Sequence, residues 1–108
     1  MNIEVGSREA STPSVCASLN VETILNSPNR MVVQGLKQGQ QLEVAKQTIK
    51  PEVIILVAKD EQGRVAGSLT PPNLITIISC IESGYKYVAV VLTDVSSGAV
   101  RVRIRGKP

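Results

Sequence analysis

The sequence contains no histidine, tryptophan or phenylalanine, and its only aromatic residues are Tyr85 and Tyr87. Because histidine is the commonest general base near neutral pH, a Ser-His-Asp or Cys-His mechanism is excluded within this chain. The glycines form no Gly-x-Gly-x-x-Gly motif and no phosphate-binding loop with its lysine. Asp60 and Glu61 are neighbouring carboxylates, but they fall in a predicted turn, where solvated acids are ordinary. We therefore predict that the chain is not an enzyme and uses no cofactor.

Cysteine is scarce as well, with Cys16 and Cys80 alone, and their separation fits no metal-ligand pattern. We therefore predict no metal site. The apolar run Ile77–Ile81 around Cys80 favours a buried thiol, and a Cys16–Cys80 disulfide is the alternative. The opening residues Met1–Val5 have neither the basic nor the apolar segment of a secretory signal, so we expect a cytoplasmic protein with reduced thiols. No apolar run approaches the ~18–20 residues that cross a bilayer, so we expect no membrane partner.

The chain is 108 residues long, which leaves room for one domain. Its apolar residues make up 43% of the sequence and are mainly valine and isoleucine, which favour strands over a helical bundle. Residues 6–14 are small and polar without any periodicity. We therefore expect a flexible N-terminal segment over residues 1–14 and a single β-rich domain over residues 15–108.

Most of the expected elements are strands. Residues 53–59 form a continuous run of valine, isoleucine and leucine, which is typical of a strand buried on both faces. Gly63 suits the turn of a hairpin that continues as a strand over residues 64–69. Two further strands are predicted over residues 31–33 and 42–45. A short helix is predicted over residues 21–26, with Asn20 as its N-cap.

A second helix is predicted over residues 71–83. Thr70 suits its N-cap, Pro71 its first turn and Gly84 its C-terminal end. Its apolar positions recur at helical spacing and form one stripe: Leu74, Ile77, Ile78 and Ile81. Together the elements predict an α+β domain with five or six mostly antiparallel strands. The strands form a curled sheet or small OB-like barrel, and this helix caps it.

The net charge is +3, and the positive charge is concentrated at the C-terminal end. Residues 85–108 carry five basic side chains against the single acid Asp94, and they predict a hairpin around Ser96-Ser97-Gly98. A three-residue loop places two pairs inward, Leu92 with Val102 and Val90 with Ile104. The outer pairs are then Thr93 with Arg101, Val91 with Arg103, and Ala89 with Arg105. A two-residue loop would mix the two faces, so burial favours the first register.

In that register the outer face of the hairpin carries both positive charge and aromatic rings. We expect Arg101, Arg103, Arg105 and Lys107 to contact phosphate, and Tyr85 and Tyr87 to stack on bases. This predicts a non-catalytic domain that binds nucleic acid. Arginines on an edge strand also prevent edge-to-edge pairing, so a structural role is the other interpretation. The alternative function is protein interaction or self-association, as a homodimer or with a partner protein, through an exposed edge strand.

Residues 53–92 combine a strand, the segment Asp60-Glu61-Gln62-Gly63-Arg64-Val65-Ala66-Gly67-Ser68-Leu69-Thr70-Pro71-Pro72, a helix ending at Gly84 and a further strand. This arrangement resembles the HIRAN domain. The positions that carry the resemblance are Val57, Gly63, Val65, Gly67, Leu69, Pro71 and Gly84. The Asp-x-Asn-Ala element of that family, which contributes to ligand binding, is absent, and the chain reads Thr48-Ile49-Lys50-Pro51-Glu52 there. The resemblance implies a small OB-like barrel and DNA, single-stranded or at its ends, as a partner.

Overall fold

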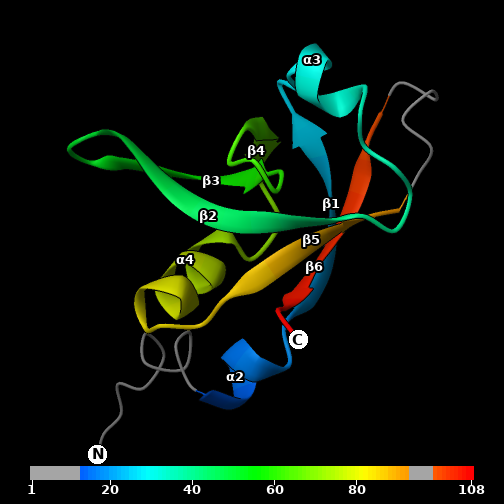
Figure 1. The fold of residues 1–108 in the computed structure, drawn as a ribbon. Coiled ribbons are helices and arrows are strands. Elements are labelled where there is room, and N and C mark those ends of the chain that lie inside the picture. The colour runs from blue at the N-terminus through cyan, green and yellow to red at the C-terminus, as the bar shows by residue number, and fades with distance from the viewer. Residues whose placement is uncertain (1–12, 93–98) are drawn as a thin grey trace, which may run out of the picture.

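The strands of the domain close into an antiparallel barrel in the order β1-β4-β3-β2-β5-β6. The computed structural model describes residues 13–92 and 99–108 (Figure 1). The strands are β1 (Asn20–Asn26), β2 (Gln41–Lys50), β3 (Val53–Lys59), β4 (Val65–Leu69), β5 (Tyr87–Val91) and β6 (Arg101–Gly106). The helices are α2 (Pro13–Ala17), α3 (Arg30–Val33) and α4 (Leu74–Glu82). The predicted α+β fold with a small antiparallel barrel is therefore confirmed.

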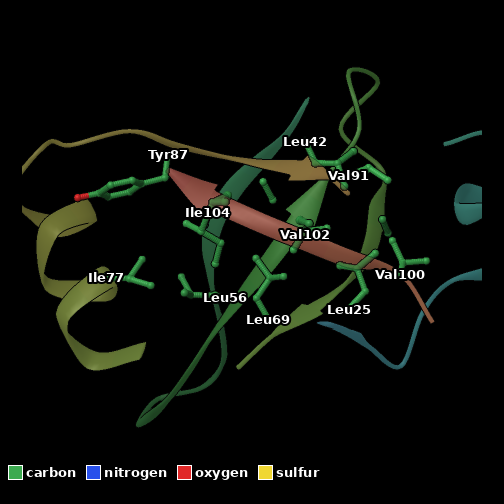
Figure 2. Packing of buried hydrophobic residues seen from close by; sticks show 14 of the residues in the cluster. Leu25, Leu42, Leu56, Leu69, Ile77, Tyr87, Val91, Val100, Val102 and Ile104 are labelled. Carbon is green, nitrogen blue, oxygen red and sulfur yellow. The ribbon is translucent and has the colours of Figure 1, made fainter. Parts of the chain in front are cut away.

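The core fills the inside of the barrel, because alternate residues of each strand point inward. Leu56 and Leu69 face each other from β3 and β4, and Ile104 enters from β6. The helix α4 covers one end of the barrel, and Figure 2 shows Ile77 pointing from it toward the strands. No helix in the described part of the chain is both long and apolar enough to cross a membrane.

The hairpin between β3 and β4 forms as predicted. Gly63 has φ +81°, the left-handed conformation that glycine adopts without steric cost. The carboxylate of Asp60 accepts hydrogen bonds of 2.9 Å from the backbone N–H groups of Gln62 and Arg64, and these bonds hold the turn. Burial of β3 on both faces is confirmed for its consecutive residues 56–58, whereas Val53 at its start is exposed.

The predicted helix begins three residues later than expected. It starts at Leu74 after Asn73, and Thr70 accepts a hydrogen bond of 2.6 Å from the side-chain amide of Asn26 instead of capping the helix. Gly84 ends the helix in the left-handed conformation, with φ +102°. The predicted apolar stripe is confirmed, with two members buried and two packed against the core: Ile77, Ile78, Leu74 and Ile81.

Two other local predictions are wrong. The helix predicted over residues 21–26 is strand β1, in which Val21, Thr23 and Leu25 alternate toward the barrel and pair with β6 or β4. The strand predicted over residues 31–33 is the short helix α3, because the side chain of Asn29 caps it by accepting a 3.1 Å hydrogen bond from the backbone of Met31. Residues 31–33 are too few to establish a period, and in residues 21–26 the apolar Ile24 interrupts the alternation of Val21, Thr23 and Leu25.

The cysteines are not the reduced thiols that the sequence favoured. Cys16 of α2 and Cys80 of α4 form a disulfide across 64 positions of the chain. Both residues are completely buried, so the predicted burial of Cys80 is confirmed. The bond fastens α2 to α4, and residues 13 and 14 therefore belong to an anchored helix. The remainder of the predicted flexible segment, residues 1–12, lies outside the described residues.

The register of the C-terminal hairpin differs from the prediction by one residue. Val91 pairs with Val102 and Ala89 with Ile104, so these residues of β5 face inward. Val90, predicted inside, instead lies opposite Arg103 on the outer face. Shifting one strand by one residue exchanges its faces. The predicted three-residue loop Ser96-Ser97-Gly98 lies outside the described residues, as do the predicted partner Thr93 and Asp94.

Candidate nucleic-acid interface

The outer face of β6 carries the three predicted arginines. Arg101, Arg103 and Arg105 alternate with Val102 and Ile104, which are fully buried in the barrel. Alternation in a strand places residues two positions apart on one face, about 7 Å from each other. The structure therefore brings the three arginines together, although the neighbouring strand β5 is in a different register from the one predicted.

Two of these arginines donate hydrogen bonds to the carboxylate of an acidic residue on β1. Arg101 Nη2 donates a hydrogen bond of 2.8 Å to Glu22 Oε1, and Arg103 Nη2 donates to Glu22 Oε2. Arg103 Nη1 also donates a hydrogen bond of 2.9 Å to Asn20 Oδ1. The hydrogen bond from Arg101, followed by the charge of Arg103, lowers the pKa of the Glu22 carboxyl below its ordinary value. Glu22 is therefore ionised at neutral pH and cancels part of the positive charge.

The remaining basic groups gather at the far end of β6. Arg105 lies opposite Val88, and the backbone N–H of Lys107 donates a 2.9 Å hydrogen bond to the carbonyl of Lys86. Within residues 13–92 and 99–108, the side chains of Lys86, Arg105 and Lys107 form no ion pair. These three cations therefore form the part of the face whose charge is not compensated by any acidic side chain among the described residues.

The two tyrosines do not lie on this face. Tyr87 lies in the core with its ring pointing toward α4 (Figure 2), is 1% exposed and donates a hydrogen bond of 2.7 Å from its hydroxyl to the carbonyl of Cys16. Burial raises the pKa of this hydroxyl. Tyr85 precedes β5 and packs half-buried against the core. The predicted stacking of bases on Tyr87 is therefore wrong, because its ring is covered by protein.

A groove of about 670 Å³ adjoins the unpaired cations. It lies between β2, the turn after β3, the end of α4 and the start of β5. Its lining includes basic, acidic and apolar side chains, among them Lys59, Lys86, Lys107, Glu43, Glu61, Tyr85 and Val88. The groove therefore adjoins the basic residues but has a mixed basic, acidic and apolar lining, in which Tyr85 is more exposed than Tyr87.

Four members of this region were not predicted from the sequence: Asn20, Glu22, Lys59 and Lys86. Asn20 and Glu22 fell in or beside a predicted helix, so nothing placed them next to β6. An alternation signal over Val21, Thr23 and Leu25 was present and would have put both polar residues on one outer face.

The described residues bring no three metal-ligating side chains together. Comparisons with protein-family models, with curated proteins and with solved structures found no match. The resemblance to the HIRAN domain therefore stays a prediction that rests on the residues quoted for it.

Proposed function

We propose that this domain binds nucleic acid without catalysis, through the outer face formed by β6 and the adjoining ends of β1 and β5. The observation that carries the proposal is the cluster of Lys86, Arg105 and Lys107, which form no ion pair with the rest of the described chain. Cations that are not neutralised by neighbouring carboxylates can neutralise phosphates and release the counterions bound to them.

The architecture supports the same interpretation. Small β-barrels of the OB type bind oligonucleotides across the outer face of their strands and in the adjoining loops. Here the groove beside Lys86 and Lys107 gives a strand of nucleic acid a path along the barrel, and the half-buried ring of Tyr85 borders that path. Arg101 and Arg103 lie at the opposite end of the same face.

The proposal is tested by fluorescence anisotropy with a labelled oligothymidylate of ~20 nucleotides, which exceeds the site of one such barrel. Wild-type protein is titrated at ~50 and ~200 mM salt, and a duplex of equal length is compared. Arg105→Gln and Lys107→Gln should each weaken binding and reduce the slope of log affinity against log salt by about 0.7. Lys50→Gln is the matched control, because Lys50 ends β2 beyond the part paired with β5. No affinity for either probe at low salt would refute the proposal.

A second candidate is self-association through a strand edge. The barrel is closed, so the expected edge at the C-terminal hairpin does not exist: β5 pairs with β2 on its other side, and β6 with β1. However, β2 pairs with β5 only over residues 41–44, whereas it pairs with β3 as far as Lys50. Figure 1 shows this β2–β3 hairpin projecting from the barrel. Its free backbone edge and its exposed apolar residues Ile49 and Val53 favour pairing with a second copy.

Light scattering distinguishes the two candidates. Self-association through the hairpin should give a dimer that persists at high salt and that Ile49→Lys converts to a monomer, since a charge at an exposed edge opposes pairing. Nucleic-acid binding by a monomer, unchanged in Ile49→Lys, would leave only the first candidate.

A further inference from the structure

Glu22 lies where an external anion would have to bind in order to use Arg101 and Arg103. Each of its carboxylate oxygens accepts a hydrogen bond from a different guanidinium group. Arginine recognises carboxylate and phosphate with the same planar arrangement of N–H donors. A phosphate that approaches these two arginines therefore competes with Glu22 for the same donors.

The pairing of β1 with β6 builds this contact. Glu22 is directly opposite Arg103, and its neighbour Ile24 is opposite Arg101, so one carboxylate reaches a direct and a diagonal neighbour. The side chains of Arg101, Arg103 and Glu22 are 53%, 39% and 37% exposed. Ion pairs that are this accessible to water are weak and exchange readily with ions from solution.

Arg103 has a second hydrogen bond that does not depend on Glu22. Its Nη1 donates to Asn20 Oδ1 at 2.9 Å, and Asn20 carries no charge. When the carboxylate moves aside, this hydrogen bond continues to orient the guanidinium group toward the outer face. Arg101 and Arg103 are therefore positioned to bind a ligand anion once the Glu22 carboxylate has moved away from them.

We propose that Glu22 is an internal competitor that sets the affinity of this face for nucleic acid, because phosphate must displace its carboxylate from Arg101 and Arg103. This inference rests on the proposed function and adds a regulatory contact to it. Displacement by one phosphate is weakly favoured, whereas a chain of phosphates that is also held at Arg105 and Lys107 reaches the arginine pair at high effective concentration. Glu22 thus selects long polyanions over single anions.

Glu22→Gln tests the proposal, because it removes the negative charge while keeping a side chain of similar size. One more phosphate neutralised per bound strand corresponds to a gain in affinity of roughly eightfold at ~50 mM salt and roughly threefold at ~200 mM. We expect these gains for the ~20-nucleotide oligothymidylate. The slope of log affinity against log salt should steepen by about 0.7.

Glu52→Gln is the matched control. Glu52 is exposed in the turn between β2 and β3, does not line the groove and forms no ion pair with the described residues, so its substitution changes the net charge equally but away from this face. A gain in Glu22→Gln alone supports the proposal. Equal gains in both variants would assign the effect to net charge and overturn it. Thermal unfolding followed by circular dichroism confirms that both variants are folded.

The double variant Glu22→Gln/Arg103→Gln completes a double-mutant cycle between Glu22 and Arg103. If Glu22 acts by occupying the arginines, adding Arg103→Gln should abolish most of the gain. Binding that Arg105→Gln weakens but Glu22→Gln leaves unchanged would overturn this inference and leave the proposed function standing. If wild type does not bind the probe, both the proposed function and this inference are refuted.

Discussion

The hydroxyl of Tyr87 donates a hydrogen bond of 2.7 Å to the backbone carbonyl of Cys16, across 71 positions of the chain. The tyrosine belongs to the barrel and the cysteine to α2, which the disulfide with Cys80 also fastens to α4. The helix α2 is therefore held at two points, by the disulfide and by this hydrogen bond. Tyr87, which was predicted from the sequence to stack on bases, therefore has a structural role instead.

Tyr87→Phe should destabilise the domain and leave nucleic-acid affinity unchanged. The substitution removes the donor and leaves the Cys16 carbonyl without this partner inside the protein, which costs about 1–2 kcal/mol. Urea unfolding measures the loss. Tyr85→Phe is the matched control, because Tyr85 is half-buried and its hydroxyl forms no hydrogen bond with other described residues. A loss of nucleic-acid affinity in Tyr87→Phe at full stability would contradict this assignment.

Loss of the disulfide should destabilise the domain strongly. The bond closes a loop of 64 positions, for which the chain-entropy model gives about 4 kcal/mol. The free energy of unfolding of the oxidised protein should therefore exceed that of Cys16→Ala/Cys80→Ala by about this amount. Because both sulfur atoms are fully buried, reductant should act slowly on the native protein and rapidly in denaturant. Equal stability of the two forms would show that the bond adds nothing to folding.

The elements that were predicted correctly are those whose signals are local. The apolar run of β3, the glycine turn at Gly63 and the helical stripe of α4 each depend on neighbouring residues alone. The three arginines were also placed together correctly, because their alternation with Val102 and Ile104 leaves only one arrangement in which the charges avoid the core.

Two of the predictions that failed depended on contacts between distant segments. Residues 88–92 are apolar at every position, so their pattern does not show which face is inside, and the three-residue loop that burial favoured gave the wrong register. The hydrogen bond of Tyr87 to Cys16 settles that face in the folded domain. Likewise, the contact of Glu22 with Arg101 spans 79 positions and exists only because β1 inserts between β4 and β6.

Gly67→Ala should destabilise the contact between β1 and β4. A methyl group at this position would lie 3.0 Å from the carbonyl oxygen of Asn26 and 3.3 Å from Cβ of Leu25. The backbone oxygen cannot rotate away as a side chain can, so β1 and β4 must separate slightly. Overpacking of this kind costs about 1–3 kcal/mol, which thermal or urea unfolding measures. Gly35→Ala is the control, because the nearest atom to its added carbon is 3.7 Å away. Equal stabilities of the two variants would contradict the close packing.

Low pH should destabilise the turn between β3 and β4, because it protonates the carboxylate of Asp60. Burial alone would raise the pKa of this carboxyl, but hydrogen bonds from the backbone and side chain of Arg64 and from the backbone of Gln62 outweigh it and lower the pKa below 3.8. Because the pKa of Asp60 is lower in the folded state than in the unfolded state, ionised Asp60 stabilises the fold. This contribution is complete when the pH is above the pKa of the unfolded state, and it is lost as the pH falls through the pKa of the folded state. The stability difference between wild type and Asp60→Asn should therefore shrink as the pH falls from about 5 to about 2.

The adjacent Glu61→Gln is the control for the loss of one negative charge, because Glu61 is exposed and forms no ion pair with any residue that the structure describes. Asp60→Asn retains an oxygen that can accept the two backbone hydrogen bonds but loses the 2.9 Å ion pair with Arg64. A difference that grew with acidity would mean that the folded state raises the pKa of Asp60, and that burial outweighs the hydrogen bonds of the turn.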